Sequence, residues 1–145
     1  QVTWEGVATA EDPAAHRTRV HFLGFNNALQ PTLTARENLL AAIGLAGGES
    51  EGADRALTAM ELVPQADRPA RWLSTGQRRR LALARLLAVD RPLWLLDEPE
   101  AGLDRASTAR LETMMDEHRR GGGIVVVASH RTLALDAPHL LDFGD

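Results

Sequence analysis

Two short, wholly apolar segments with a helical segment between them constrain this sequence more than any other feature. Residues 93–96 read Leu-Trp-Leu-Leu, and residues 124–128 read Ile-Val-Val-Val-Ala. Runs of this length and composition are typical of strands in a parallel sheet that is covered on both faces. The segment 106–119 between them predicts a helix, which the three glycines at 121–123 end. Strand, helix and strand at this spacing predict a right-handed βαβ unit and an α/β fold.

Two capping boxes indicate where further helices begin. Thr34 is followed three residues later by Glu37, and Ser74 is followed three residues later by Gln77. In each pair the two side chains can satisfy backbone N–H groups at the start of a helix. A third helix is expected between these two, over residues 53–62.

The N-terminal part of the chain predicts strands and a connecting segment. Residues 1–6 alternate apolar and polar side chains and end on glycine, which is typical of a strand that enters a turn. Residues 20–24 predict a second short strand. The segment between them contains Asp12-Pro13 and is expected to be a loop or a short helix.

Composition limits the classes of function. The length of 145 residues is that of one domain, and the net charge of -4 argues against a nucleic-acid partner. The chain has no Cys, so disulfides are excluded, and no apolar run approaches the roughly 20 residues that span a bilayer. Any membrane role is therefore expected to involve a partner. All sixteen basic residues are Arg, and the cluster 78–80 is expected to be a solvated helix face with salt bridges.

Polar residues follow both apolar strands. Asp97 and Glu98 come directly after the first strand, and His130 follows the second. In an open parallel sheet, ligands bind beyond the carboxyl ends of the strands, so Glu98 and His130 are expected to meet at one edge. One carboxylate could hold a water of a Mg²⁺ shell, and the other could polarise a water that attacks a γ-phosphate. From the residues alone, a solvated strand cap and an ordinary surface or core histidine remain open alternatives.

These residues form part of a longer pattern. Residues 93–104, LWLLDEPEAGLD, resemble the Walker B strand and D-loop of ATP-binding-cassette (ABC) proteins, and residues 73–85, LSTGQRRRLALAR, resemble their signature motif. His130 lies where that family has its switch histidine. The resemblance implies an α/β P-loop NTPase (ABC ATPase) fragment with a parallel sheet, antiparallel strands and a helical subdomain. That subdomain would cover roughly residues 35–90 of a single, partial nucleotide-binding domain over 1–145, and the Walker B to switch-histidine half would cover 91–145.

The resemblance also implies roles for the residues at the end of the sheet. Glu98 would be the general base, Asp97 would hold Mg²⁺ through a water, and His130 would contact the γ-phosphate of ATP.

A second group of residues is implied to act across a dimer. Ser74, Gly76 and Gln77 would contact the ATP held by a second ATPase subunit, and Asp104 would link the two sites. The start of this helix can bind a phosphate, because free N–H groups at a helix start attract anions and a glycine lets the backbone approach a phosphate closely. Ser74 would also act as the N-cap of its helix.

Two departures from the family pattern stand out. The sequence contains no G-x-x-x-x-G-K-[ST] loop and no Lys, so the cradle for the β- and γ-phosphates is absent. We expect the chain to be an N-terminally truncated fragment that by itself is inactive. The position where the family usually has a Mg²⁺-contacting Gln is held by Phe25, which leaves Asn26 or a water to substitute for it.

The second departure points to one branch of the family. Residues 22–39, FLGFNNALQPTLTARENL, resemble the LGH-x-x-x-L-K-P-x-L-T-x-x-E-N-L stretch of the ATP-binding subunit of the haem exporter of cytochrome c maturation (CcmA type), which commonly has His where Phe25 stands. That resemblance implies a subunit that hydrolyses ATP with Mg²⁺ and drives haem export or delivery in c-type cytochrome biogenesis. It would lie peripherally on the cytoplasmic face of the inner membrane and work with integral membrane transporter subunits and a second ATPase subunit. The alternatives are an ATPase for another exporter (drug or lipid), a non-transport ABC protein, and a catalytically weak regulatory domain.

Overall fold

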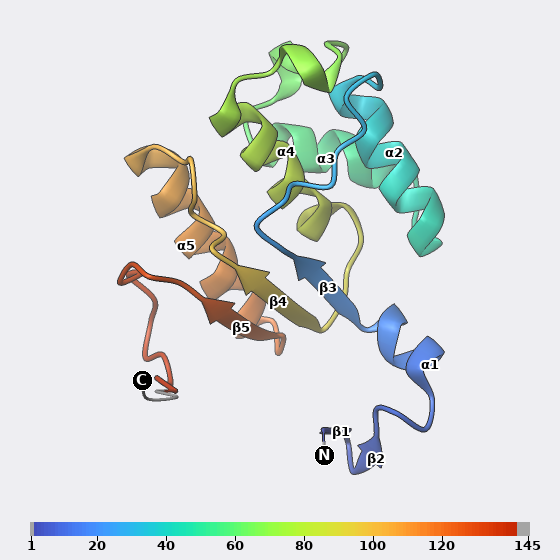
Figure 1. Cartoon of the computed structure of the whole chain (residues 1–145), viewed down its shortest axis with the longest axis vertical. Coiled ribbons are helices and arrows are strands. Elements are labelled where there is room, and N and C mark those ends of the chain that lie inside the picture. The colour runs from blue at the N-terminus through green and yellow to red at the C-terminus, as the bar shows by residue number, and fades with distance from the viewer. Residues whose placement is uncertain (1, 142–145) are drawn as a thin grey trace.

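A computed structural model describes residues 2–141 of the chain (Figure 1). Its centre is a parallel sheet in which β4 lies between β3 and β5. The strands are β3 (Val20–Leu23), β4 (Leu93–Asp97) and β5 (Ile124–Ala128). The long helix α5 (Arg105–Arg120) connects β4 to β5 and packs against β5. The predicted strand, helix and parallel strand are therefore confirmed.

The N-terminal segment forms a small antiparallel hairpin that is separate from the main sheet. Strand β1 (Thr3–Trp4) pairs with β2 (Val7–Ala8), and Gly6 takes a positive φ of 84° in the turn between them. The connecting segment that follows is helical, as α1 (Pro13–Thr18). The Asp12 carboxylate caps this helix by accepting a hydrogen bond from the Ala15 N–H at 2.9 Å.

Three helices pack on one another beyond the arrowhead of β3 (Figure 1). They are α2 (Ala35–Ala46), α3 (Glu51–Ala59) and α4 (Thr75–Ala88), with two short 3₁₀ turns, η1 (Val63–Gln65) and η2 (Ala70–Trp72), before α4. Both predicted capping boxes are present, at Thr34 and at Ser74. The middle helix, α3, begins two residues earlier than predicted. It ends at Ala59 and not at Leu62, because the backbone takes a left-handed conformation at Glu61, with a φ of 52°.

The hydrophobic core lies among these helices and continues to one face of the sheet. Leu39, Leu57 and Leu83 come from the three helices and are 0–1% exposed. On the sheet, Trp94 and Leu96 of β4 join the same core at 3% exposure. This core holds the end of β4, and therefore the residues that follow it, in a fixed position.

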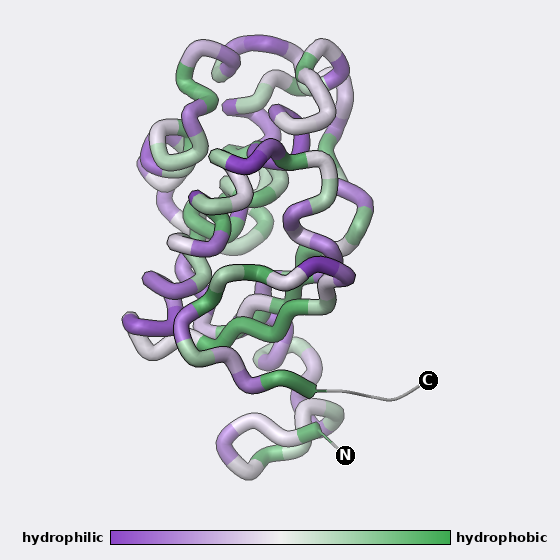
Figure 2. The backbone as a smooth tube through the Cα atoms, turned by 90° about the vertical axis from the view of Figure 1, so that its left-hand side faces the viewer, coloured by the Kyte–Doolittle hydropathy of each residue, from purple (hydrophilic) through white to green (hydrophobic). Residues whose placement is uncertain are grey.

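The other face of the sheet is open within the described residues, which corrects the prediction that both faces are covered. Successive residues of a strand point to opposite faces. The residues that alternate with the buried ones are therefore on the open face, where Phe22 is 68% exposed and Ile124 and Val126 are each 50% exposed. Figure 2 shows the hydrophobic strand segments side by side beneath the helices. None of the helices in residues 2–141 has the length and apolarity needed to cross a bilayer.

Candidate functional site

The residues that follow β4 and β5 stay together beyond the sheet. Asp97 is the last residue of β4 and pairs with Ala128, the last residue of β5. The Glu98 N–H then donates a hydrogen bond to the Ala128 carbonyl at 2.8 Å. This bond extends the strand pairing by one residue and brings the two following segments to one edge.

Glu98 and His130 meet at this edge, so their expected proximity is confirmed. The backbone N–H of His130 donates to Oε1 of Glu98 at 3.0 Å, and Nε2 of the imidazole lies 3.4 Å from the same oxygen. The Glu98 side chain is 23% exposed, whereas that of His130 is 94% exposed. One carboxylate oxygen is therefore fixed by the backbone, which leaves the other able to accept a proton from a water.

The backbone of Glu98 is strained. Its φ is 47°, in the left-handed region that residues other than glycine enter at a cost of about 1–2 kcal/mol. Such strain persists where the surrounding structure holds it, and it gathers at functional sites. Two of the contacts that hold this residue are the Glu98 N–H bond to β5 and a bond from the Arg79 guanidinium to the Glu98 carbonyl at 2.6 Å.

Asp97 is suited to an outer role at a Mg²⁺ ion. Within residues 2–141 its carboxylate has no hydrogen-bond partner, and no group of three or more His, Cys, Asp or Glu in the same range could hold a metal ion by itself. Mg²⁺ keeps several waters and takes few protein carboxylates. A single hard oxygen donor at the strand end therefore fits the predicted contact with a Mg²⁺-bound water, and a direct ligand would have to come from elsewhere.

The start of α4 is a complete capping box. Ser74 Oγ accepts a hydrogen bond from the Gln77 N–H at 3.2 Å, and Gln77 Oε1 accepts one from the Ser74 N–H at 2.9 Å. The role of Ser74 as an N-cap is therefore confirmed. Gly76 lies close to Gly102 of the segment after β4, because a Cβ at residue 76 would be 3.3 Å from the Gly102 carbonyl oxygen.

Asp104 begins α5 in a similar way. Its carboxylate accepts a hydrogen bond from the Ser107 N–H at 2.7 Å, and this bond holds the pKa of the Asp104 carboxyl below its usual value. Gly102 therefore lies between the start of α4, where Thr75 and Gly76 approach it, and Asp104 at the start of α5. Within the described part of the chain, no hydrogen bond joins Ser74, Gly76 or Asp104 to Glu98 or His130.

Two buried charged residues near this edge escaped the sequence analysis. Arg79 is only 2% exposed, which corrects the expectation of a solvated face at this position, whereas Arg80 forms an expected salt bridge, with Glu61 at 3.9 Å. Glu100 is 1% exposed and accepts a hydrogen bond from Ser129 Oγ, which joins the segment after β4 to the segment after β5. No sequence pattern reveals the burial of either residue. Arg79, for example, is the middle one of three consecutive arginines and looks like its neighbours.

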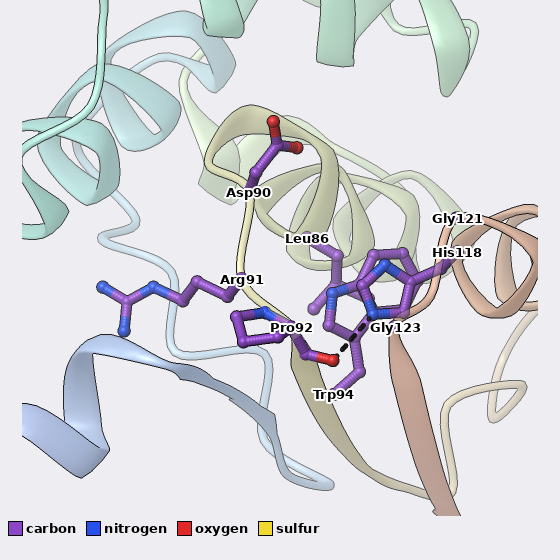
Figure 3. A pocket seen from close by; sticks show the side chains of 8 residues that line it. All are labelled: Leu86, Asp90, Arg91, Pro92, Trp94, His118, Gly121 and Gly123. Carbon is purple, nitrogen blue, oxygen red and sulfur yellow. Dashed lines mark hydrogen bonds between the residues drawn. The ribbon is translucent and has the colours of Figure 1, made fainter.

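A hollow of about 330 Å³ lies at the opposite, amino-terminal end of the strands (Figure 3). His118 stacks on Trp94 there, with ring centroids 4.0 Å apart. A Cβ at residue 123 would lie 2.1 Å from His118 Nε2, so this imidazole would have to shift if Gly123 were replaced. Burial lowers the pKa of His118. None of the predicted site residues lines this hollow, so it is distinct from the carboxyl edge.

Comparison with protein families matches the family described as ABC transporter to residues 1–101. The matched segment includes the start of α4, all of β4 and the Asp97-Glu98 pair.

The curated relatives of this chain include proteins named cytochrome c biogenesis ATP-binding export protein CcmA. The protein from Rhodospirillum rubrum is 48% identical over 141 residues, which are 97% of this chain and 60% of the relative. The protein from Bordetella bronchiseptica is 48% identical over 134 residues, which are 90% of this chain and 59% of the relative. The chain therefore spans about 60% of the length of these relatives.

A solved structure agrees with the fold. It is a dimeric ATP-binding cassette in a post-hydrolysis state, bound to ADP and Pi, and it matches with a TM-score of 0.72 and 29% identity over 87% of this chain and 58% of that chain. The matching family model covers more than half of the sequence, and the fold agrees with it. The chain belongs to the ABC transporter family.

Proposed function

We propose that this chain is part of a subunit that hydrolyses ATP with Mg²⁺ to drive an ABC transporter. The observation that carries the proposal is the meeting of Glu98 and His130 at the carboxyl edge of the sheet, in a chain of this family. Paired groups of this kind at this edge suit the terminal phosphate of a nucleotide.

In the proposed reaction, Glu98 acts as the general base. Its Oε1 is held by the His130 N–H, and its second oxygen accepts a proton from the water that attacks the γ-phosphate. The exposed imidazole of His130 donates a hydrogen bond to a γ-phosphate oxygen. Asp97 would hold a water of the Mg²⁺ shell, where the bound ion would supply positive charge against the phosphate oxygens.

We propose that the second group of residues serves the nucleotide of a partner ATPase subunit. The capping bond uses a lone pair of Ser74 Oγ, so its O–H is free to donate to a phosphate. The N–H groups of the first turn of α4, including that of Gly76, and the Gln77 amide would add further donors. Asp104 lies beside this group and would connect the two sites of the dimer.

The proposed cargo is haem, for c-type cytochrome biogenesis, delivered through integral membrane transporter subunits. Support comes from relatives that are 48% identical and carry the name of a cytochrome c biogenesis export protein. The subunit would lie peripherally at the cytoplasmic face of the inner membrane.

The hydrolytic role is tested with Glu98→Gln in a protein that has the full length of the relatives. We expect its steady-state MgATP hydrolysis to fall by about 10²–10⁴-fold, the usual contribution of a general base. Glu117→Gln on the exposed side of α5 is the matched control and should retain wild-type activity. Wild-type turnover in the Glu98→Gln protein would refute the assignment.

The cargo is tested separately by complementation. Bacteria that lack their own CcmA are given the full-length protein or its Glu98→Gln variant, and covalently bound haem in their c-type cytochromes is measured. Restoration by the wild-type protein alone supports haem export. No restoration by a protein that hydrolyses ATP would favour another exporter.

A further inference from the structure

The Arg79 guanidinium is buried where three segments meet. Its Nε, Nη1 and Nη2 all donate hydrogen bonds, and the side chain comes from the second turn of α4. The acceptors are the carbonyl oxygens of Pro99 (3.0 Å), Gly24 (3.0 Å), Phe25 (3.4 Å), Asp97 (3.1 Å) and Glu98 (2.6 Å), and Oδ1 of Asn27 (3.0 Å).

These acceptors belong to two loops that leave neighbouring strands. Gly24 to Asn27 follow β3, and Asp97 to Pro99 run from the last residue of β4 into the loop after it. A single planar fork with five N–H donors can reach both loops at once, which the single ammonium group of lysine cannot do with the same geometry. Arg79 therefore fixes the two loops relative to each other and to α4.

The charge of this side chain is balanced locally. Burial lowers the pKa of the Arg79 guanidinium, and the carboxylates of Glu100, Asp97 and Glu98 act in the opposite direction. An arginine stays protonated in such a site. A permanently charged donor forms stronger hydrogen bonds than a neutral one, so it is well suited to hold carbonyl groups in a strained conformation.

The strain to be held is at Glu98, whose φ is 47°. The shortest of the Arg79 bonds, at 2.6 Å, goes to the carbonyl of this residue. Fixing that carbonyl fixes the direction in which the Glu98 side chain leaves the backbone, toward the His130 N–H.

We propose that Arg79 is a positioning residue for the general base: it holds the left-handed backbone of Glu98 against the Gly24–Asn27 loop so that the carboxylate faces the attacking water. This inference rests on the proposed hydrolytic function. In this proposal Arg79 acts through the geometry of Glu98, because the hydrogen bonds of its guanidinium go to backbone and side-chain oxygens of the two loops.

The test uses Arg79→Lys in the full-length protein, with Arg80→Lys as the matched control on the same helix. Arg80 donates to the Met60 carbonyl on the side of α3 and not to either loop. A displacement of a catalytic group by about 1 Å can cost about 10²-fold in rate. We therefore expect Arg79→Lys to lower kcat for MgATP by about that factor while KM for ATP stays close to wild type, both measured well below the Tm of the variant, and Arg80→Lys to leave kcat unchanged.

A second variant, Asn27→Ala, keeps the test decisive if Arg79→Lys does not fold. It removes only one acceptor, so kcat should fall by a smaller factor, again without a change in KM. Wild-type kcat in both folded variants, or a parallel loss of Tm, ATP binding and kcat, would overturn the proposal.

The wild-type and Glu98→Gln proteins are assayed in parallel to separate the two claims. If Glu98→Gln is inactive and Arg79→Lys is fully active, only the positioning role fails. If Glu98→Gln is fully active, the proposed function itself fails.

Discussion

The helical part of the molecule and its sheet bury their apolar side chains to very different degrees. Among α2, α3 and α4, the large residues Leu39, Leu57 and Leu83 are 0–1% exposed. On the outer face of the sheet, Phe22 and Val126 are 68% and 50% exposed. The helices thus form a closed core within the described residues, whereas the sheet is closed on one face only.

This difference indicates which part of the molecule holds the candidate site in place. The closed core reaches the sheet at Trp94 and Leu96, directly before the functional residues, and Arg79 extends this rigid support to Glu98. Within residues 2–141, no hydrogen bond or ion pair joins Glu98 to the exposed side chains of the outer sheet face, such as Phe22 and Val126. The geometry of the carboxyl edge is therefore expected to depend on the helical side far more than on the open face.

The largest expected effect compares one truncation in each region. Leu39→Ala in the closed core should lower the free energy of unfolding by about 2–5 kcal/mol, because it leaves a cavity among packed helices. Val126→Ala on the open face should cost about 1 kcal/mol or less, because solvent already reaches that side chain. Urea unfolding measures both. Equal losses at the two positions would show that the outer face is as closed as the helical core.

A smaller effect is expected from two glycines of the helical part. A Cβ at Gly52 would lie 2.3 Å from the backbone oxygen of Ala88, whereas a Cβ at Gly44 would meet nothing within 4 Å. Gly52→Ala should force α3 and α4 apart and cost about 1–3 kcal/mol. Gly44→Ala should stabilise α2 by about 0.4–1 kcal/mol by restricting the unfolded chain. Thermal unfolding compares the two, and opposite signs are the expected result.

A histidine at the contact between the sheet and the helical part is expected to make the free energy of unfolding depend on pH. His21 of β3 donates through Nε2 to the Val89 carbonyl at the end of α4, and burial lowers the pKa of this histidine. Below about pH 6.5 the unfolded chain therefore binds the proton more readily than the folded chain, and the free energy of unfolding falls as the pH decreases toward the folded pKa. His21→Gln should weaken this dependence between pH 7.5 and pH 5, measured by urea unfolding. A variant with the same slope as wild type would remove His21 as its cause.

The features that depend on neighbouring residues in the chain were predictable from the sequence. The capping boxes at Thr34 and Ser74, the apolar strands and the connecting helix are all local patterns, and all are present. The meeting of Glu98 and His130 followed from one topological rule about parallel sheets.

The features that depend on distant contacts were not predictable. Arg79 is buried because acceptors 18 to 55 residues away surround it, and the sequence does not distinguish it from Arg78 or Arg80. The left-handed backbone of Glu98 is likewise held by residues from β5 and α4. The exposure of Val126 was mispredicted because a β-branched apolar run indicates a strand but does not say what covers each face.

The central claim is that Glu98 performs hydrolysis without being needed for nucleotide binding. Sedimentation velocity of the full-length Glu98→Gln protein tests it most directly, because ATP that is bound but not hydrolysed should keep two subunits together. We expect a stable dimer with MgATP and a monomer with MgADP, while the wild-type protein returns to monomer as it consumes its ATP. A Glu98→Gln protein that binds MgATP and stays monomeric, or that releases its partner as fast as wild type does, would contradict the account.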